Sequence, residues 1–270
     1  MSTPHLSRCA LVFIFAFAPK LALSKGLSPS RPATVPADRI INFYENRLRL
    51  SKIKGPQIIP SISVLESRNL DSQIDWKVVP ETKIEDLTIQ FRSTRDVKIL
   101  KDQEQRDRRI TWLYPDDGCY ARAELVVDQL EDQNSVVPMK IFAFGNLNVA
   151  TKNSPAGTVT WWYHVAPILR VGDTVYVMDA SIDPTAPLPV AEWTKRMGGG
   201  EIRLSICTTH AYDPNSDCNA VSPTRHDQAI VDEVTLLGME WNRVQELGRN
   251  PENELGNLPP WVPAVRLSVE

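Results

Sequence analysis

The chain has 270 residues, of which 42% are hydrophobic and 23% charged, and its formal net charge is −3. A chain of this length can fill one sizeable hydrophobic core, or one core with a small additional domain. The slight acidic excess gives no support to nucleic-acid binding, so no nucleic-acid partner is expected.

The first 24 residues are typical of a secretory signal peptide. Arg8 stands in a short polar start, a compact apolar run extends from Cys9 to Pro19, and small residues follow at Ala22 and Ser24. The run is shorter than the roughly 20 apolar residues that a membrane helix needs. We therefore predict cleavage after Ser24 and a secreted or periplasmic protein with no membrane attachment once the signal is removed. The alternative is an apolar N-terminus on a cytoplasmic protein.

Residues 25–80 predict a linker followed by a short helical segment. The stretch from Lys25 to Ala37 is rich in proline and serine, which is typical of a linker. Asp38 fits the N-cap of a helix whose apolar residues recur between positions 40 and 48. Prolines interrupt the apolar pieces that follow, and no element is predicted there.

Two segments of the next part are predicted from their patterns. Asp86 to Arg92 alternates between polar and apolar residues, which predicts a strand. Lys101 to Arg109 is a run of charges, which indicates a solvated surface segment.

The central part predicts a helix and then antiparallel strands. Asp116 to Gly118 is a turn signal, and the residues after it carry apolar side chains at helical spacing (Tyr120, Ala123, Val127 and Leu130). Met139 to Gly145 predicts a strand. A hairpin is predicted from two strands, Thr158 to Val171 and Thr174 to Asp179, which the turn Gly172-Asp173 joins.

The last part predicts two helices. A short one from Val190 to Met197 ends at three glycines, and a long one from Asp227 to Leu247 has apolar residues on one face and Gly248 as its cap. A helix, an antiparallel hairpin and further helices in this order predict an α+β fold.

The cysteines predict one disulfide and one free thiol. Cys9 leaves with the signal, and Cys207 and Cys218 bracket a loop rich in turn-forming residues. In an oxidising compartment such a loop is easily closed by a disulfide. That pairing leaves Cys119 free, either as a reactive thiol, as a buried inert residue or as half of an intermolecular bridge.

Cys119 lies directly after a glycine turn, in the first turn of the predicted helix. Unpaired backbone N–H groups and the positive end of the helix dipole favour an anion at that position. Both effects make a thiolate more available, and the same N–H groups can accept an oxyanion. The sequence therefore predicts Cys119 as a nucleophile, with a small residue that merely fills the helix start as the alternative.

The histidines are the candidate bases for this thiol. His210 lies in the predicted disulfide loop and His226 at a helix start, so both are expected at the surface, whereas His164 lies within a strand. Counting outward from the hairpin turn places Asp179 one diagonal step from His164 on the same side of the sheet. Asp183 shares this parity but precedes a proline, and parity alone leaves both aspartates open.

The aromatic residues before His164 and one arginine complete the candidate set. Trp161, Trp162 and Tyr163 are expected to alternate between the faces of the sheet, with Trp162 and Tyr163 as candidate substrate-binding residues. Arg122 lies one helical turn from Cys119, where it either fixes the helix start or a substrate carbonyl, or forms a surface salt bridge.

Three stretches resemble the bacterial protein-glutaminases: DGCYARAE around Cys119, WYHVAP around His164 and YVMDAS around Asp179. The resemblance extends from about Trp112 to Trp193. It implies a papain- and transglutaminase-like fold, with the cysteine at a helix N-terminus packed on an antiparallel sheet that carries the histidine and the aspartate. It further implies that Cys119 is the nucleophile, His164 the general base and acid, and Asp179 the orienting carboxylate.

The resemblance also implies an activity, which is hydrolysis of the side-chain amide of protein- or peptide-bound glutamine through a thioester. The partner is then a protein or peptide substrate bearing glutamine, and neither a metal nor an organic cofactor is expected. Residues 81–270 would form the catalytic domain, and residues 25–80 would be an inhibitory pro-segment or part of the working domain. A cysteine peptidase, a transglutaminase and a non-catalytic exported binding protein remain as alternatives.

Overall fold

The computed structural model describes residues 74–198, 201–221 and 225–262. The predicted signal peptide, the linker and the helix after Asp38 lie outside the described residues. Within the described ranges, no helix has both the length and the hydrophobicity that crossing a bilayer requires.

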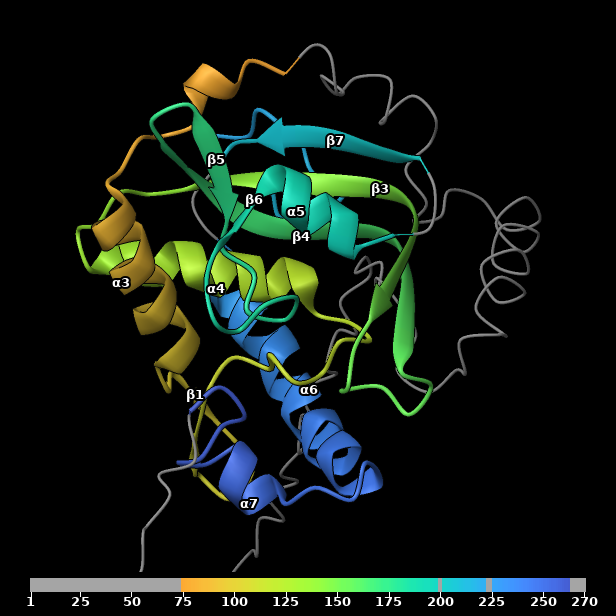
Figure 1. Ribbon diagram of the computed structural model, residues 1–270. Helices are drawn as coiled ribbons and strands as arrows, with labels where there is room; N and C mark the ends of the chain where they lie inside the picture. Colours follow the sequence, from red (N-terminus) through yellow and green to blue (C-terminus); the bar gives the residue numbers. More distant parts are fainter. Residues whose placement is uncertain (1–73, 199–200, 222–224, 263–270) are drawn as a thin grey trace, which may run out of the picture.

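A five-stranded antiparallel sheet forms the centre of the molecule (Figure 1). Its order is β6-β5-β4-β3-β7, and its strands are β3 (Met139–Ala150), β4 (Thr158–Val171), β5 (Thr174–Val177), β6 (Leu188–Pro189) and β7 (Ile202–Cys207). The predicted hairpin is confirmed, because Val171 pairs with Thr174 and the pairing continues to Ile168 and Val177.

Helices cover both faces of this sheet, which makes the fold α+β as predicted. Figure 1 shows α4 (Cys119–Asp132) and, beyond it, α6 (His226–Glu246) on one side, while α5 (Val190–Arg196) lies on the other. Alternate residues of the strands supply two hydrophobic clusters. Phe142 and Val165 pack with the first cluster, which includes residues of α4, whereas Ile141 and Ile168 pack with the second, which includes Trp193 of α5.

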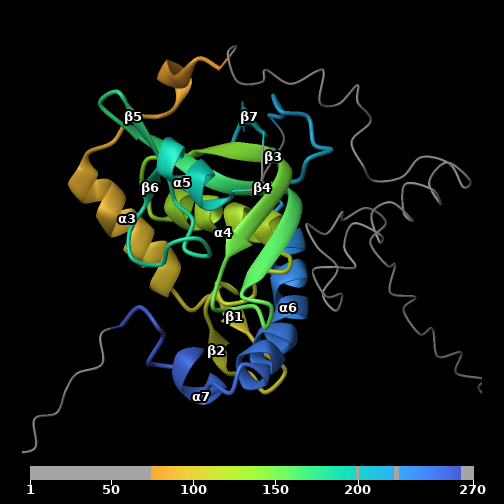
Figure 2. The ribbon, with the colours of Figure 1, turned by 45° about the vertical axis from the view of Figure 1, so that its right-hand side comes forward.

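The β3–β4 hairpin is long and curved, and its tip reaches α6 (Figure 2). Asn153 at the tip accepts hydrogen bonds from Arg243 at 3.2 Å and from Arg249 at 2.7 Å. These contacts tie the far end of the sheet to the C-terminal end of α6, where Gly248 has the positive φ of +69° that a helix-ending glycine adopts.

The strand predicted from Asp86 to Arg92 is wrong, because this segment lies within helix α3 (Ile84–Asp96). Leu87 and Phe91 are four residues apart and both are buried, whereas Ile89 between them is exposed. The segment therefore follows the helical period, with carboxylates in its first turn where the helix dipole favours them. Before it, residues Trp76–Val78 form the short 3-10 helix η2.

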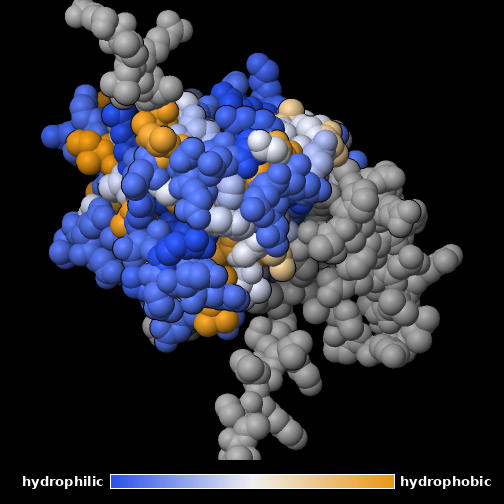
Figure 3. Space-filling view, turned by 90° about the horizontal axis from the view of Figure 1, so that it is seen from below, coloured by the Kyte–Doolittle hydropathy of each residue, from blue (hydrophilic) through white to orange (hydrophobic). Residues whose placement is uncertain are grey.

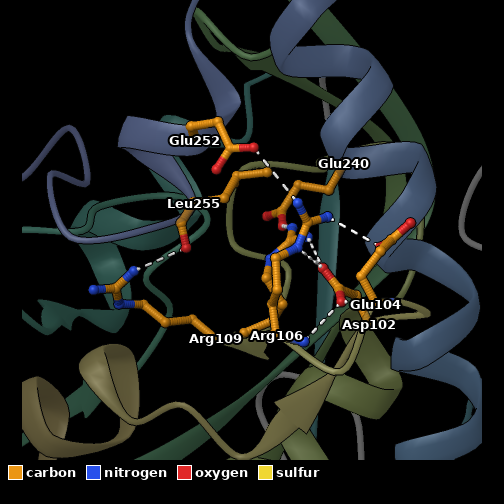
Figure 4. A network of polar contacts seen from close by, with 8 residues as sticks. Asp102, Glu104, Arg106, Arg109, Glu240, Glu252 and Leu255 are labelled. Atoms are coloured by element: carbon orange, nitrogen blue, oxygen red, sulfur yellow. Dashed lines mark hydrogen bonds and ion pairs between the residues drawn. The ribbon is translucent and has the colours of Figure 1, made fainter.

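The charged segment from Lys101 to Arg109 is only partly a solvated surface. It contributes to the small sheet of β1 (Leu100–Lys101) and β2 (Asp107–Arg108), where Asp102 and Arg108 are buried. Arg108 pairs with Glu240 of α6 at 3.0 Å. Figure 4 shows how Arg106 joins Asp102 and Glu104 and reaches Glu252 in the short helix α7 (Pro251–Glu254). The charge run thus packs this small sheet against the C-terminal helices.

The face seen in Figure 3 is mainly hydrophilic, with separate hydrophobic residues scattered over it. The exposed apolar side chains of α6 are Val231, Val234 and Met239. Of the apolar residues expected to share one face of this helix, Leu237 and Val244 are buried and Val234 is exposed, and the buried face also carries carboxylates.

Candidate active site

Cys119 is the first residue of α4, which confirms the predicted helix start. Gly118 is the N-cap and has the left-handed φ of +90°, so the chain turns sharply into the helix. Cys119 is buried and is the free cysteine of the described residues. Its position at the N-terminal end of a 14-residue helix places it beside unpaired backbone N–H groups and the positive end of the helix dipole, which favour a thiolate.

Glycine is required at position 118 by space as well as by backbone conformation. A Cβ atom there would lie 2.4 Å from Cδ1 of Leu236, 2.9 Å from Nη1 of Arg122 and 2.9 Å from Oε1 of Glu233. Helix α6 therefore presses directly on the turn that presents the candidate nucleophile.

Arg122 holds this turn from inside, because its side chain is buried beneath the loop that precedes Cys119. Its Nη1 donates to the carbonyl oxygen of Asp117 at 2.7 Å and approaches those of Tyr114 and Thr111 at 3.4 and 3.5 Å. Of the three roles expected for Arg122, fixing the helix start agrees with these contacts, and the surface salt bridge is wrong because the side chain is buried.

Three charged residues of α6 hold the same loop from the other side. Glu233 accepts hydrogen bonds from the backbone N–H and the hydroxyl of Thr111 at 2.9 and 2.8 Å. Glu240 accepts a hydrogen bond from the backbone N–H of Leu113 at 2.9 Å. Arg243 forms an ion pair with Asp116 at 2.5 Å.

Burial dominates the electrostatics of Glu240. It raises the pKa of this carboxyl group to about 7, although Arg108 acts in the opposite direction. Sequence reasoning missed these residues of α6. The available signal was the spacing of Glu233 and Glu240, which are seven residues apart and so share one helical face.

His164 and Asp179 form a buried pair in which Nε2 of the imidazole lies 2.7 Å from Oδ2 of the carboxylate. Burial lowers the pKa of His164, but the charge and hydrogen bond of Asp179, together with Cys119, outweigh it and raise the pKa to about 9. Burial raises the pKa of Asp179, but His164, Ser181 and Trp193 outweigh it and lower the pKa to about 2. The pair therefore favours an imidazolium beside a carboxylate.

The Asp179 carboxylate is held by several further donors. Its Oδ1 accepts from the backbone N–H of Ser181 at 3.1 Å and from the Ser181 hydroxyl at 2.6 Å. Its Oδ2 accepts from Nε1 of Trp193 at 2.9 Å. Asp183, the other aspartate that parity allowed, instead bonds Thr185 and pairs with Arg196 at 3.0 Å.

The thiol of Cys119 is a neighbour of the same imidazole. Nδ1 of His164 is buried and lacks a regular hydrogen-bond partner among the described residues. The side chain of Cys119 is nevertheless near enough to raise the pKa of His164, through hydrogen bonding to the ring and through its charge. The side chain of Cys119 and the pair His164–Asp179 are thus brought together, from a helix, a strand and the segment after β5. This arrangement can transfer the thiol proton to Nδ1 while Nε2 stays on the carboxylate.

The remaining predicted residues lie in varied surroundings. Tyr163 is fully buried in the cluster that contains Cys119, whereas Trp162 is half-buried and its Nε1 has no partner among the described residues. His226 is exposed and contacts Asp128 at 3.0 Å, and His210 is half-buried.

The predicted disulfide between Cys207 and Cys218 is formed. It closes the loop that follows β7, and the loop packs against α4 through an edge-to-face contact of Tyr212 with Tyr120, whose ring centroids are 5.4 Å apart. Over the ranges that the structure describes, no group of three or more histidine, cysteine, aspartate or glutamate residues is arranged to hold a metal ion.

The expected alternation of Trp161, Trp162 and Tyr163 is wrong, since Trp161 and Tyr163 belong to different hydrophobic clusters. The pairing of β3 with β4 shifts between Phe144 and Leu147, which is a bulge. Gly145 lies at this bulge with φ +151°. An isolated glycine within a predicted strand was the signal that could have indicated it.

Comparison with known proteins gives a match to a family. Residues 87–197 match the family model described as glutaminase. No curated protein matches the chain. Similar solved structures include the NMR structure of protein-glutaminase from Chryseobacterium proteolyticum, which is 20% identical over 58% of this chain and 89% of that chain, with a TM-score of 0.47. A crystal structure of protein-glutaminase is 19% identical over 52% and 89% of the two chains, with a TM-score of 0.42.

A crystal structure of pro-protein-glutaminase is 17% identical over 79% of this chain and 68% of that chain, with a TM-score of 0.43. The family match includes the positions of Cys119, His164 and Asp179, and it confirms the resemblance found in the sequence. The segment that carries these three residues is therefore similar to the glutaminase family.

Proposed function

We propose that this protein hydrolyses the side-chain amide of glutamine in proteins or peptides to glutamate and releases ammonia. One observation carries the proposal, which is a buried free thiol at the start of α4 beside the His164–Asp179 pair, within the segment that matches the glutaminase family. Nucleophile, base and orienting carboxylate in this relation are the parts that covalent acyl transfer needs.

The reaction begins with attack of the Cys119 thiolate on the side-chain amide carbon of glutamine. Backbone N–H groups at the start of α4 stabilise the negative charge that develops on the amide oxygen. Imidazolium His164 gives its proton to the departing nitrogen, the carbon–nitrogen bond breaks, and ammonia leaves a thioester on Cys119. Water then loses a proton to His164 and adds to the thioester carbon, after which glutamate leaves and the thiol is restored.

Substrate contact is proposed for the aromatic residues before His164, and Trp162 is the better placed of the two. Its half-buried ring lies beside Phe144, with 6.3 Å between the ring centroids, whereas its Nε1 is buried and has no partner among the described residues, so the proposed contact is made by the ring. Tyr163 has no exposed surface, so its contribution would be to the shape of the core behind the site.

The proposed location is outside the cytoplasm, secreted or periplasmic. The disulfide between Cys207 and Cys218 supports this, because such bonds persist mainly in oxidising compartments. N-terminal sequencing of the exported protein would test cleavage after Ser24.

A peptidase or a transglutaminase could use the same three residues, because these enzymes differ in the bond attacked or in the acceptor rather than in the nucleophile. Incubation of the purified protein with a glutamine-containing peptide, followed by mass spectrometry, separates them. The small mass increase of amide-to-acid conversion supports the proposal. A cleaved peptide or an amine adduct would contradict it.

Replacement of the nucleophile tests the mechanism. Cys119→Ser is expected to reduce ammonia release by at least about 10³-fold, because the hydroxyl is far less ionised than the thiol. Thermal stability should remain close to that of the wild type, since the two side chains are similar in size. His210→Ala provides a histidine control that should leave the rate unchanged.

A non-catalytic exported binding protein is distinguished by the reactivity of the thiol. An activated Cys119 should react rapidly with iodoacetamide at mildly acidic pH, and the reaction should disappear in the serine variant. A thiol that resists alkylation in the folded protein would contradict the enzymatic proposal.

A further inference from the structure

The indole of Trp161 lies flat on the imidazole of His164. Their ring centroids are 4.4 Å apart and the planes are inclined by only 9°. Trp161 is buried, so this contact is shielded from solvent. The negative face of an indole favours a cation above it, and the effect is larger where water is excluded.

The indole nitrogen of Trp161 makes a second contact with the site. Its Nε1 donates to the carbonyl oxygen of Pro115 at 2.9 Å. Pro115 belongs to the loop that leads into Cys119, the same loop that Arg122 and the carboxylates of α6 hold. A single side chain therefore contacts both the candidate base and the backbone that presents the candidate nucleophile.

This double contact lies where the pairing of β3 with β4 is irregular. Residues three apart in a regular strand point to opposite faces of the sheet, so Trp161 and His164 would be separated. Here Trp161 and Tyr163 belong to different hydrophobic clusters, the pairing shifts between Phe144 and Leu147, and the rings of Trp161 and His164 stack. The chain thus departs from regular strand geometry at the point where the stack forms.

A second indole lies near the imidazole. The ring of Trp193 is 5.8 Å from that of His164 and inclined by 34°, and its Nε1 donates to the same Asp179 oxygen that faces His164. Trp193 therefore acts mainly on the carboxylate, whereas Trp161 acts on the imidazole. The charged and titratable groups that act most directly on His164 are Asp179, from the segment after β5, and Cys119, from α4.

We propose that Trp161 is a positioning residue of the active site, which stabilises the imidazolium form of His164 by stacking and fixes the loop of Cys119 through Pro115. The inference rests on the proposed function for its catalytic meaning. Trp161 acts through other residues and does not need to touch the substrate.

The stacking half of the proposal is tested by a titration that needs no substrate. NMR of 15N-labelled histidine follows the titration of His164 in the wild type, in Trp161→Leu and in Trp161→Phe. Trp161→Leu removes the aromatic face, so the titration midpoint should fall by about 0.5 to 1 pH unit. Trp161→Phe retains a stacked ring and should keep most of the wild-type midpoint.

Trp76→Leu is the matched control, because Trp76 packs against the same hydrophobic cluster as Trp161 but is not a ring partner of His164. It should lower thermal stability and leave the titration of His164 unchanged. An equal midpoint in Trp161→Leu, Trp76→Leu and the wild type would overturn the stacking half.

The hydrogen-bonding half is tested by Trp161→Phe, which keeps a ring but loses the donor to Pro115. Alkylation of Cys119 at mildly acidic pH should slow by about threefold to tenfold. In the deamidation assay, kcat should fall by a similar factor while KM stays within about twofold, since substrate contacts are unchanged. Alkylation at the wild-type rate would overturn this half, and the phenylalanine variant gives an answer even if the leucine variant fails to fold.

The titration and the alkylation also separate this inference from the proposed function. If the wild type released no ammonia from glutamine peptides while Trp161→Leu still shifted the titration of His164, the proposed activity would be wrong and the positioning role would stand. If ammonia release were normal and neither variant changed the titration or the alkylation, the positioning role alone would be wrong.

Discussion

Asp179 and Asp183 are four residues apart and share the parity that would allow either to face His164. The structure gives them different partners. Asp179 is buried with contacts to His164, Ser181 and Trp193, whereas Asp183 fixes its own turn through Thr185 and pairs with Arg196. Pairing beyond β5 continues only as far as Met178, whose N–H donates to Pro167 at 2.9 Å, and this last bond places Asp179 beside the imidazole.

This difference predicts unequal effects of two matched substitutions. Asp179→Asn should reduce kcat for deamidation by about 10² to 10⁴-fold, because an amide neither stabilises the imidazolium nor holds the ring in the same tautomer. Asp183→Asn should stay within about threefold of the wild type. Steady-state ammonia release from a glutamine peptide measures both, and equal losses would show that Asp179 is not the orienting residue.

The charge state of the pair predicts a pH dependence. The pKa of His164 is raised from 6.5 to about 9, so the stability that its protonated form contributes is complete below about pH 6.5 and is lost as the pH rises through 9. The pKa of Asp179 is lowered from 3.8 to about 2, so its contribution is present above 3.8 and is lost as the pH falls through 2.

Deamidation should therefore decline in an alkaline limb near pH 9, because the departing nitrogen needs the proton of His164. A profile of kcat/KM against pH measures this limb, and unfolding by denaturant should show lower stability near pH 10 than near pH 7. An alkaline limb near the ordinary histidine value of 6.5 would contradict the buried ion pair.

At the scale of one element, the start of α4 shows how a turn residue limits the site. Gly118 combines a left-handed backbone with close approach of α6, whereas Gly157 has a similar φ of +71° but no atom within 4 Å of the position of a Cβ. A comparison of substitutions at these two glycines therefore separates the loss of stability from backbone strain from the loss caused by steric overlap.

Gly118→Ala is expected to lower the free energy of unfolding by about 2 to 5 kcal/mol, from left-handed strain together with overlap with Leu236 and Arg122. Gly157→Ala should cost about 1 kcal/mol, from the backbone alone. Denaturant unfolding compares the two variants. Equal losses would mean that α6 yields easily and does not hold the turn.

The elements also show why some predictions from the sequence succeed and others fail. The hairpin was predictable because its turn and β-branched strands indicate one structure. In α3, the short stretch that contains Leu87 and Phe91 fits both a strand and a helix, and only the burial of both residues beside an exposed Ile89 decides between them. In α6, carboxylates share the buried face with apolar residues, because the partners of these carboxylates are groups of a loop over 100 residues earlier. The seven-residue spacing of the two glutamates indicates a shared helical face, but a single sequence does not identify the loop that this face contacts.

At the scale of the whole molecule, the disulfide anchors a loop that braces the helix of the candidate nucleophile. Besides its contact with Tyr120, Tyr212 of this loop donates its hydroxyl proton to Asp232 of α6 at 2.7 Å. The loop thus contacts both α4 and α6.

Replacement of both Cys207 and Cys218 by alanine should lower the free energy of unfolding by about 3 kcal/mol, the loop-closure entropy that the bond removes from the unfolded chain. Cys119 should still be alkylated, and kcat should remain within about threefold, because the catalytic contacts lie elsewhere. Thermal unfolding with and without reductant provides the control, since reductant should destabilise the wild type and leave the double variant unchanged. Loss of Cys119 reactivity in a folded double variant would contradict the view that the disulfide contributes to stability and not to the reactivity of Cys119.

The contacts that hold the loop before Cys119 extend beyond the segment that contains the candidate catalytic residues. All three candidate catalytic residues lie within the segment 87–197 that matches the family, yet Glu233, Glu240 and Arg243 lie beyond it. A minimal fragment that ended after α5 would retain every reacting atom and lose the clamps on Thr111, Leu113 and Asp116. Transplantation of this chemistry into another scaffold would therefore have to include a helix equivalent to α6.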